Sequence, residues 1–213
     1  MARKKISNKP RRTILIVTAT EAEALYFSQM RKDSRFSNLT VLWEQEFKDL
    51  EHLITLASRY RNTGNYSVVW VLFGLADLAI TPAEVKMQIP YAKKKKVGLA
   101  WTNPAMPLWY LLHLQTPRGF VGQTSLISSA LEKSLPGFSS DASYLLTDGM
   151  YLHLKLYPAK AKASLNANAY NRLVEQDLGL AAISLVPLLN DITEICGLAD
   201  LTHNQKQLGM NKG

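Results

Sequence analysis

The sequence predicts an α/β protein, with a mainly parallel sheet flanked by helices and a mostly helical C-terminal half. Two short apolar runs, over residues 14–17 and 68–73, are rich in β-branched residues, as buried parallel strands are. Segments with helical spacing of apolar residues separate such runs up to about residue 114. Beyond residue 116 no strand of similar quality follows, so we expect helices there.

The first half alternates strands and helices. Thr20 and Glu23 stand three residues apart, as in a capping box, and predict that a helix begins directly after the first strand. Pro107 suits the first turn of a later helix. In chain order we expect a strand over 13–19, a helix to 32, a strand over 39–44, a helix over 49–62, a strand over 66–73, a helix over 82–95, a strand over 97–102 and a helix over 107–114. This alternation favours a parallel sheet with helices on both faces.

The second half and the two ends complete the expected organisation. Helices are expected over 125–135, 150–156, 159–176 and 184–197. We therefore divide the chain into a disordered basic arm over 1–12, an α/β core over 13–115, a helical part over 116–197 packed on the core, and a flexible tail over 198–213.

Composition limits the class of protein. The 213 residues are 47% hydrophobic, which suits one globular domain with a sizeable core. The single cysteine, Cys196, excludes an intrachain disulfide and a thiolate zinc site, and it favours a reducing compartment. Since no apolar run reaches the roughly 18 residues that span a membrane, we expect a cytoplasmic protein without a membrane partner.

Positive charge gathers in two places. The net charge is +8, and Arg11 and Arg12 end a basic N-terminal arm. A second cluster consists of Lys93, Lys94, Lys95 and Lys96. Such clusters attract polyanions through counterion release, so we expect weak, sequence-independent binding of nucleic acid. The alternative is that both clusters are ordinary solvated segments.

Four blocks of the sequence occur in an order that resembles one family. Residues 14–17 (ILIV) precede Tyr26-Phe27, and the run over 69–73 (VWVLF) follows. The third block contains Asn103, Pro104, Trp109 and His113, and the fourth consists of residues 135–138 (LPGF) and 167–169 (ANA). Over about residues 12–195 the chain is thus similar to the RloB-like family of the Toprim nucleotidyl-transfer and nuclease group. The resemblance implies a Toprim/Rossmann-like sheet, a bacterial setting near restriction or phage-defence genes, and an AAA-type ATPase as partner.

The departures from the family pattern concern its metal site. The Toprim glutamate is expected at position 19, the aspartate pair at 74 and 76, and a further glutamate at 107. Ala19, Gly74, Ala76 and Pro107 stand there instead. Since none of these side chains can coordinate Mg²⁺ or move a proton, we predict no metal, no cofactor and no catalysis. The chain is then a pseudoenzyme that binds nucleic acid or a partner protein.

Two alternatives remain open. Relocated acids, Glu21, Glu23 and Asp77, with His113 as a further candidate, would make an active Mg²⁺-dependent nuclease. Glu21 and Glu23 also fit as first-turn acids that favour the helix dipole, and His113 as a buried core histidine. In the second alternative the resemblance is accidental and the chain is an unrelated α/β protein-interaction module.

Overall fold

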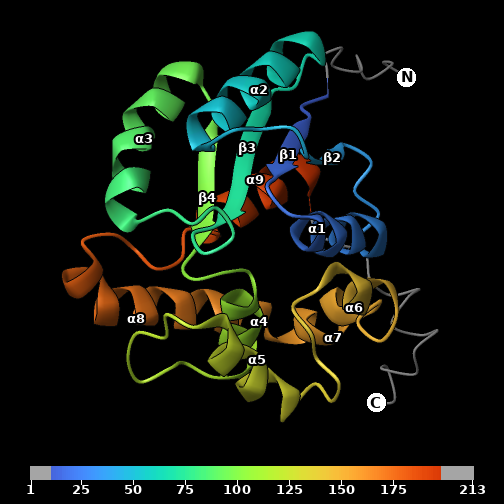
Figure 1. The fold of residues 1–213 in the computed structure, drawn as a ribbon. Coiled ribbons are helices and arrows are strands. Elements are labelled where there is room, and N and C mark those ends of the chain that lie inside the picture. The colour runs from blue at the N-terminus through green and yellow to red at the C-terminus, as the bar shows by residue number, and fades with distance from the viewer. Residues whose placement is uncertain (1–10, 198–213) are drawn as a thin grey trace, which may run out of the picture.

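The computed structural model describes residues 11–197 and contains one parallel sheet. Its strands are β1 (Ile14–Thr18), β2 (Leu39–Trp43), β3 (Val68–Gly74) and β4 (Gly98–Thr102), in the order β2-β1-β3-β4. β1 pairs in parallel with β2 and with β3, and β3 pairs in parallel with β4 (Figure 1). The expected fold class is therefore confirmed. The tail over 198–213 and most of the basic arm lie outside the described residues.

The helices follow the expected order, with two differences. Their bounds are α1 (Glu21–Asp33), α2 (Leu50–Thr63), α3 (Pro82–Lys95), α4 (Pro107–Leu114), α5 (Thr124–Glu132), α6 (Ala142–Leu146), α7 (Leu152–Leu156), a 3₁₀ turn (Tyr157–Ala159), α8 (Lys160–Leu178) and α9 (Val186–Cys196). α6 was not expected, because five residues are too few for a periodic pattern. α9 begins later than predicted because the preceding segment runs beside β4. There the Ser184 amide donates to the Trp101 carbonyl, and Ile183 bridges Thr102.

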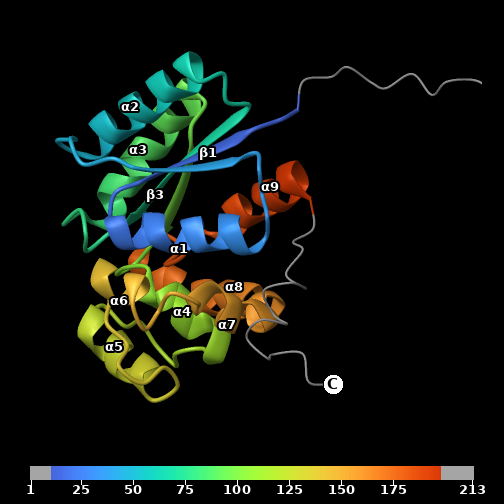
Figure 2. The ribbon, with the colours of Figure 1, turned by 90° about the vertical axis from the view of Figure 1, so that its right-hand side faces the viewer.

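Helices cover both faces of the sheet (Figures 1 and 2). Alternate residues of β1 enter two different cores, as the two-residue period of a strand requires. Leu15 and Val17 pack with the residues of α2 and α3, whereas Ile14 and Ile16 pack with those of α1, α4 and α9. The predicted capping box also forms, since the Glu23 amide donates to Thr20 and the Thr20 amide donates to the Glu23 carboxyl group.

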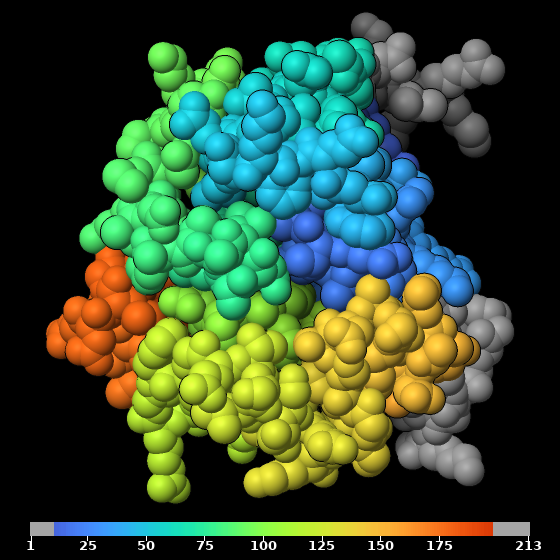
Figure 3. Space-filling view, in the orientation of Figure 1, coloured from blue at the N-terminus to red at the C-terminus, as the bar shows by residue number. Residues whose placement is uncertain are grey.

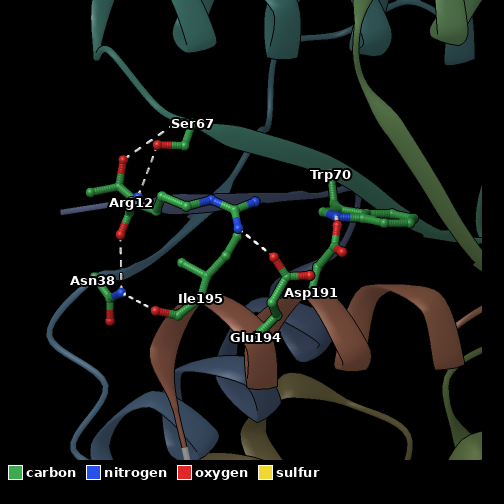
Figure 4. A network of polar contacts seen from close by, with 8 residues as sticks. Arg12, Asn38, Ser67, Trp70, Asp191, Glu194 and Ile195 are labelled. Carbon is green, nitrogen blue, oxygen red and sulfur yellow. Dashed lines mark hydrogen bonds and ion pairs between the residues drawn. The ribbon is translucent and has the colours of Figure 1, made fainter. Parts of the chain in front are cut away.

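Hydrogen bonds and an ion pair hold the last helix, α9, against the sheet (Figure 4). The Asn38 side-chain amide donates to the carbonyls of Arg12 and Ile195, at 3.0 and 2.8 Å. The Trp70 indole N–H donates to Asp191 at 2.9 Å, and Arg12 pairs with Glu194. Residues far apart in sequence thus hold the helical half on the sheet.

The rest of the helical half packs at the carboxyl ends of the strands (Figure 1). In the space-filling view it makes up the lower part of the molecule, from yellow-green to orange (Figure 3). Asn171 of α8 makes two hydrogen bonds with the backbone of Ile183, at 2.8 and 3.0 Å. Gln29 of α1 donates to the carbonyls of Leu145 and Gly149. Within residues 11–197, no helix has the length and apolar character needed to cross a bilayer.

Candidate functional site

Three strands end side by side at the carboxyl ends of the parallel strands, where open parallel sheets bind their ligands. We call this end of the sheet its carboxyl edge and the opposite end its amino edge. The Ala19 amide donates to the Leu72 carbonyl at 3.0 Å, and the Leu75 amide donates to the Thr102 carbonyl at 2.9 Å. The loops after β1, β3 and β4 are therefore adjacent. Three of the positions with lost carboxylates, Ala19, Gly74 and Ala76, lie in this loop cluster, and Pro107 opens α4 just beyond it.

Glu23 lies at this edge, but it is fully buried. Its side chain is 0% exposed, and one carboxyl oxygen, Oε2, accepts from the Thr20 amide at 3.0 Å. The other oxygen, Oε1, has no hydrogen-bond partner in the described part of the chain. Burial, reinforced by the charge of Asp77, raises the pKa of Glu23 to about 8. Glu23 is therefore mostly protonated at neutral pH.

Asp77 is the second acid at the edge. The residue is exposed, yet its carboxylate folds back over the end of β3. Its Oδ2 lies 2.2 Å from the point where a Cβ on Gly74 would stand. Glycine at position 74 thus leaves room for a carboxylate that arrives from position 77. Partial desolvation raises the pKa of Asp77.

Tyr110 adds an unsatisfied polar group near this pair. Its hydroxyl is buried without a hydrogen-bond partner among the described residues. Burial is the main reason that its pKa lies well above the usual range, and the charges of Tyr26 and Glu23 raise it further. As an aromatic residue of an apolar helix, Tyr110 is expected in the core or at an interface, and it is buried. Its nearness to Glu23 depends on how α4 packs against α1, which no local pattern reveals.

Mg²⁺ or Mn²⁺, the ion that the Toprim resemblance implies, does not fit these residues. Such ions take several oxygen ligands, most of them charged or strongly polar. Glu23 already caps α1 and is mostly protonated at neutral pH, so Asp77 alone of the pair is left to bind an ion. Glu21 lies in the first turn of α1 and is partly exposed. Over residues 11–197 no three His, Cys, Asp or Glu side chains are grouped so that they could hold a metal.

His113 lies in the apolar helix α4, one turn after Trp109. The imidazole is 3% exposed, its Nδ1 bonds to the Trp109 carbonyl at 2.9 Å, and burial lowers its pKa to about 4. Asn103 and Pro104 join β4 to α4 through a cis peptide bond. The Pro104 carbonyl accepts from the Ala76 amide, and the Asn103 amide donates to Ala182. The motif thus ties the loop after β3 to the segment before α9.

The basic residues lie at the opposite, amino edge of the sheet. Lys93, Lys94 and Lys95 form the last turn of α3, and Lys96 ends that helix just before β4. Arg11 and Arg12 precede β1, which starts at the same edge because all strands are parallel. The Ser58 hydroxyl of α2 donates to the Lys95 carbonyl at 3.3 Å, which brings the end of α2 to this edge as well.

The amino edge also collects cations that the sequence pattern did not single out. Arg59 and Arg61 lie in the last turn and a half of α2. We call the whole set the amino-edge cluster: Arg11, Arg12, Arg59, Arg61, Lys93, Lys94, Lys95 and Lys96. Arg12 is partly engaged by Glu194, although its side chain remains 52% exposed. Cations at the ends of α2 and α3 also favour the helix dipoles, so they have a structural role in addition.

Comparison with known proteins gives one positive result. A family model described as RloB-like protein matches residues 14–191. Searches of curated proteins and of solved structures returned no significant match.

Proposed function

This chain belongs to the RloB-like protein family, and we propose that it binds nucleic acid without cutting it. The observation that carries the proposal is the chemical state of Glu23. A carboxyl group that is buried, caps its own helix and has a pKa of about 8 is a poor ligand for a divalent cation at neutral pH. Without the ion, the charge that develops in phosphoryl transfer lacks its main stabilising group.

The amino-edge cluster supports the binding half of the proposal. Its eight cations come from three separate segments and lie at one edge of the sheet, away from the acids at the carboxyl edge. Each phosphate that such a cluster neutralises releases condensed counterions, and this gain does not depend on base sequence. We therefore expect affinity for both single-stranded and duplex nucleic acid that falls steeply with salt.

A salt titration tests the surface. Short single-stranded and duplex DNA and RNA would be titrated by fluorescence anisotropy between roughly 50 and 200 mM salt. The test variant replaces Lys93, Lys94, Lys95 and Lys96 by Gln. Its matched control makes the same charge change at four exposed lysines elsewhere: Lys32, Lys48, Lys133 and Lys155.

The two variants should behave differently. The test variant should bind more weakly and with a smaller log–log salt slope, by about 0.9 for each lost phosphate contact on duplex DNA. The control variant should keep most of the wild-type slope. Equal losses in both would mean that net charge alone drives binding. An unchanged affinity in the test variant would favour a protein partner instead.

One observation favours a second candidate, a metal-dependent nuclease with relocated acids. Asp77 places a carboxylate where the side chain of residue 74 would lie, close enough to Glu23 to raise its pKa. Incubation with DNA and RNA in Mn²⁺ decides between the two. We expect no cleavage, and cleavage that Asp77→Ala or Glu21→Ala abolishes would establish the nuclease.

The proposal includes the setting that the family resemblance implies. The chain would act as a component of a bacterial restriction or phage-defence locus, beside an AAA-type ATPase. Co-expression with the ATPase encoded next to it, followed by affinity purification, tests this part. Recovery of a stable complex supports it, and recovery of the chain alone counts against it.

A further inference from the structure

A small cavity lies between α1, α4, α8 and α9, in a different place from the two acids and from the amino-edge cluster. Its inner end is lined by Tyr26, Trp109 and His113 and its outer end by Ser34, Thr193 and Gly197. Both ends share Met30, His153, Tyr157, Lys160 and Leu189. The space that the centre of a water-sized sphere can occupy is about 40 Å³ in the outer end and about 10 Å³ in the inner end. A single water needs roughly 10–15 Å³ of such space, so a small ion fits only in the outer end.

Two of the lining polar groups are buried without a partner. The Ser34 hydroxyl belongs to a residue that is 3% exposed, and the Trp109 indole N–H to one that is 1% exposed. Neither has a hydrogen-bond partner among residues 11–197. Leaving a donor unsatisfied in a protein interior is costly, and native structures avoid it. The indole N–H lies beside the Tyr26 hydroxyl, so the Ser34 hydroxyl is the group that points to a partner outside the described residues.

A cation completes the lining. Lys160 is half-buried, its Nζ lies 5.9 Å from the centre of the Tyr157 ring, and desolvation lowers its pKa. No ion pair of Lys160 with a carboxylate occurs within the described chain. Of the described residues that line the cavity, none is Asp or Glu. A desolvated ammonium group in such surroundings favours an anion beside it.

Two histidines, His113 and His153, contribute further polar atoms to the lining. His153 bonds through Nδ1 to Asp33 at 2.9 Å, which leaves its Nε2 for the cavity, while Asp33 itself does not line it. His113 uses Nδ1 for the Trp109 carbonyl, so its Nε2 is likewise left for a ligand. With the proton on Nδ1, the Nε2 of a neutral imidazole is an acceptor, so His153 suits an oxyanion that carries a proton of its own.

We propose that the outer end of this cavity binds a small tetrahedral oxyanion of the phosphate class, held by Lys160 and Ser34. The anion accepts from the unpartnered Ser34 hydroxyl and lies beside the lysine charge. Free phosphate and the terminal phosphate of an ester share this chemistry.

Thermal unfolding and calorimetry with inorganic phosphate test the site in the full chain. Ser34→Ala removes a hydroxyl that has no partner, so the variant should fold like the wild type. Lys160→Met removes the charge and keeps most of the apolar stem. Loss of a hydrogen bond to a charged group corresponds to about a tenfold or greater loss of affinity, which we expect in each variant.

Controls separate the cavity from phosphate bound elsewhere on a basic protein. Lys155→Met makes the same charge change at an exposed residue of α7 that does not line the cavity, and it should bind phosphate like the wild type. The four-lysine variant of the amino-edge cluster should also retain binding. If phosphate affects all these proteins equally, or affects none of them, the site does not exist.

A second titration distinguishes a free phosphate ion from the phosphate group of an ester. A nucleoside 5′-monophosphate is titrated in parallel with inorganic phosphate. Binding of both, each weakened by Ser34→Ala, indicates that the cavity takes a phosphate ester. Binding of inorganic phosphate alone, again weakened by Ser34→Ala, indicates a free ion. The site is independent of the proposed nucleic-acid surface, because the amino-edge variant tests that surface separately.

Discussion

Replacing Glu23 by Gln should make the protein more stable than the wild type, by an amount that grows as the pH rises from 4.5 to about 8 and is constant above that. Gln has nearly the shape of the protonated carboxyl group and can still accept from the Thr20 amide. It differs from Glu because it cannot ionise when the chain unfolds. The comparison therefore isolates the free energy of keeping the Glu23 carboxyl group neutral in the folded state.

The sign and size follow from the pKa of Glu23. It rises from 4.5 to about 8 on folding, so the folded state holds a proton that the unfolded chain releases in this range. Stability contributed by the neutral carboxyl group is thus complete below pH 4.5 and is lost as the pH rises to about 8. The slope approaches about 1.4 kcal/mol per pH unit. Integrated from pH 4.5 to about 8, this slope gives a loss of folding free energy of about 5 kcal/mol, which is an upper bound.

Urea unfolding of both proteins across this pH range measures the effect as a difference curve. Glu84→Gln is a matched control, because Glu84 forms the same capping box with Thr81 at the start of α3. Glu84 is exposed, and its hydrogen bonds to Thr81 lower its pKa. Its difference curve should therefore be flat above about pH 6, since both states are almost fully ionised there.

A flat curve for Glu23→Gln would refute the reasoning. It would mean that Glu23 is ionised in the folded protein and is accessible to water or to a cation. Repeating the titration with Mn²⁺ sharpens the result. A bound divalent ion would favour the carboxylate and reduce the pH dependence of the wild type, whereas the pseudoenzyme hypothesis predicts no change.

Three further predictions concern stability. His113→Gln should reduce the loss of stability on acidification from pH 6.5 to about 4, because the buried wild-type imidazole resists the proton that the unfolded chain accepts; unfolding at several pH values measures this, and an unchanged profile would contradict it. Gly98→Ala should destabilise the fold by about 1–3 kcal/mol, since its Cβ would lie 2.5 Å from the Trp70 ring, and a neutral effect in urea would show that the ring moves freely. Asn171→Ala should cost about 1–3 kcal/mol, because the backbone N–H and C=O of Ile183 lose their partner, and the loss should be absent if water replaces the amide.

The sequence by itself determined the local elements and their alternation. Strands over residues 14–17 and 68–73 were predicted and are confirmed, and so is the capping box of Thr20 and Glu23. These features depend on neighbours a few residues away, and the period of two or 3.6 residues reports them directly. α6 escaped because its pattern is too short, and the start of α9 was misplaced because a bridge to β4 holds the preceding residues.

Only the tertiary structure decided the pKa of Glu23, the extent of the cationic surface and the lining of the cavity. From the sequence Glu23 could be a helix cap or a metal ligand, and its burial beside Asp77 gives it a raised pKa. Arg59 joins the lysine run only because α2 and α3 end at the same edge of the sheet. Ser34 and Lys160 line one cavity although they are far apart in the chain. A pKa or a binding surface depends on desolvation and on the charges nearby, and these are set by packing between distant segments.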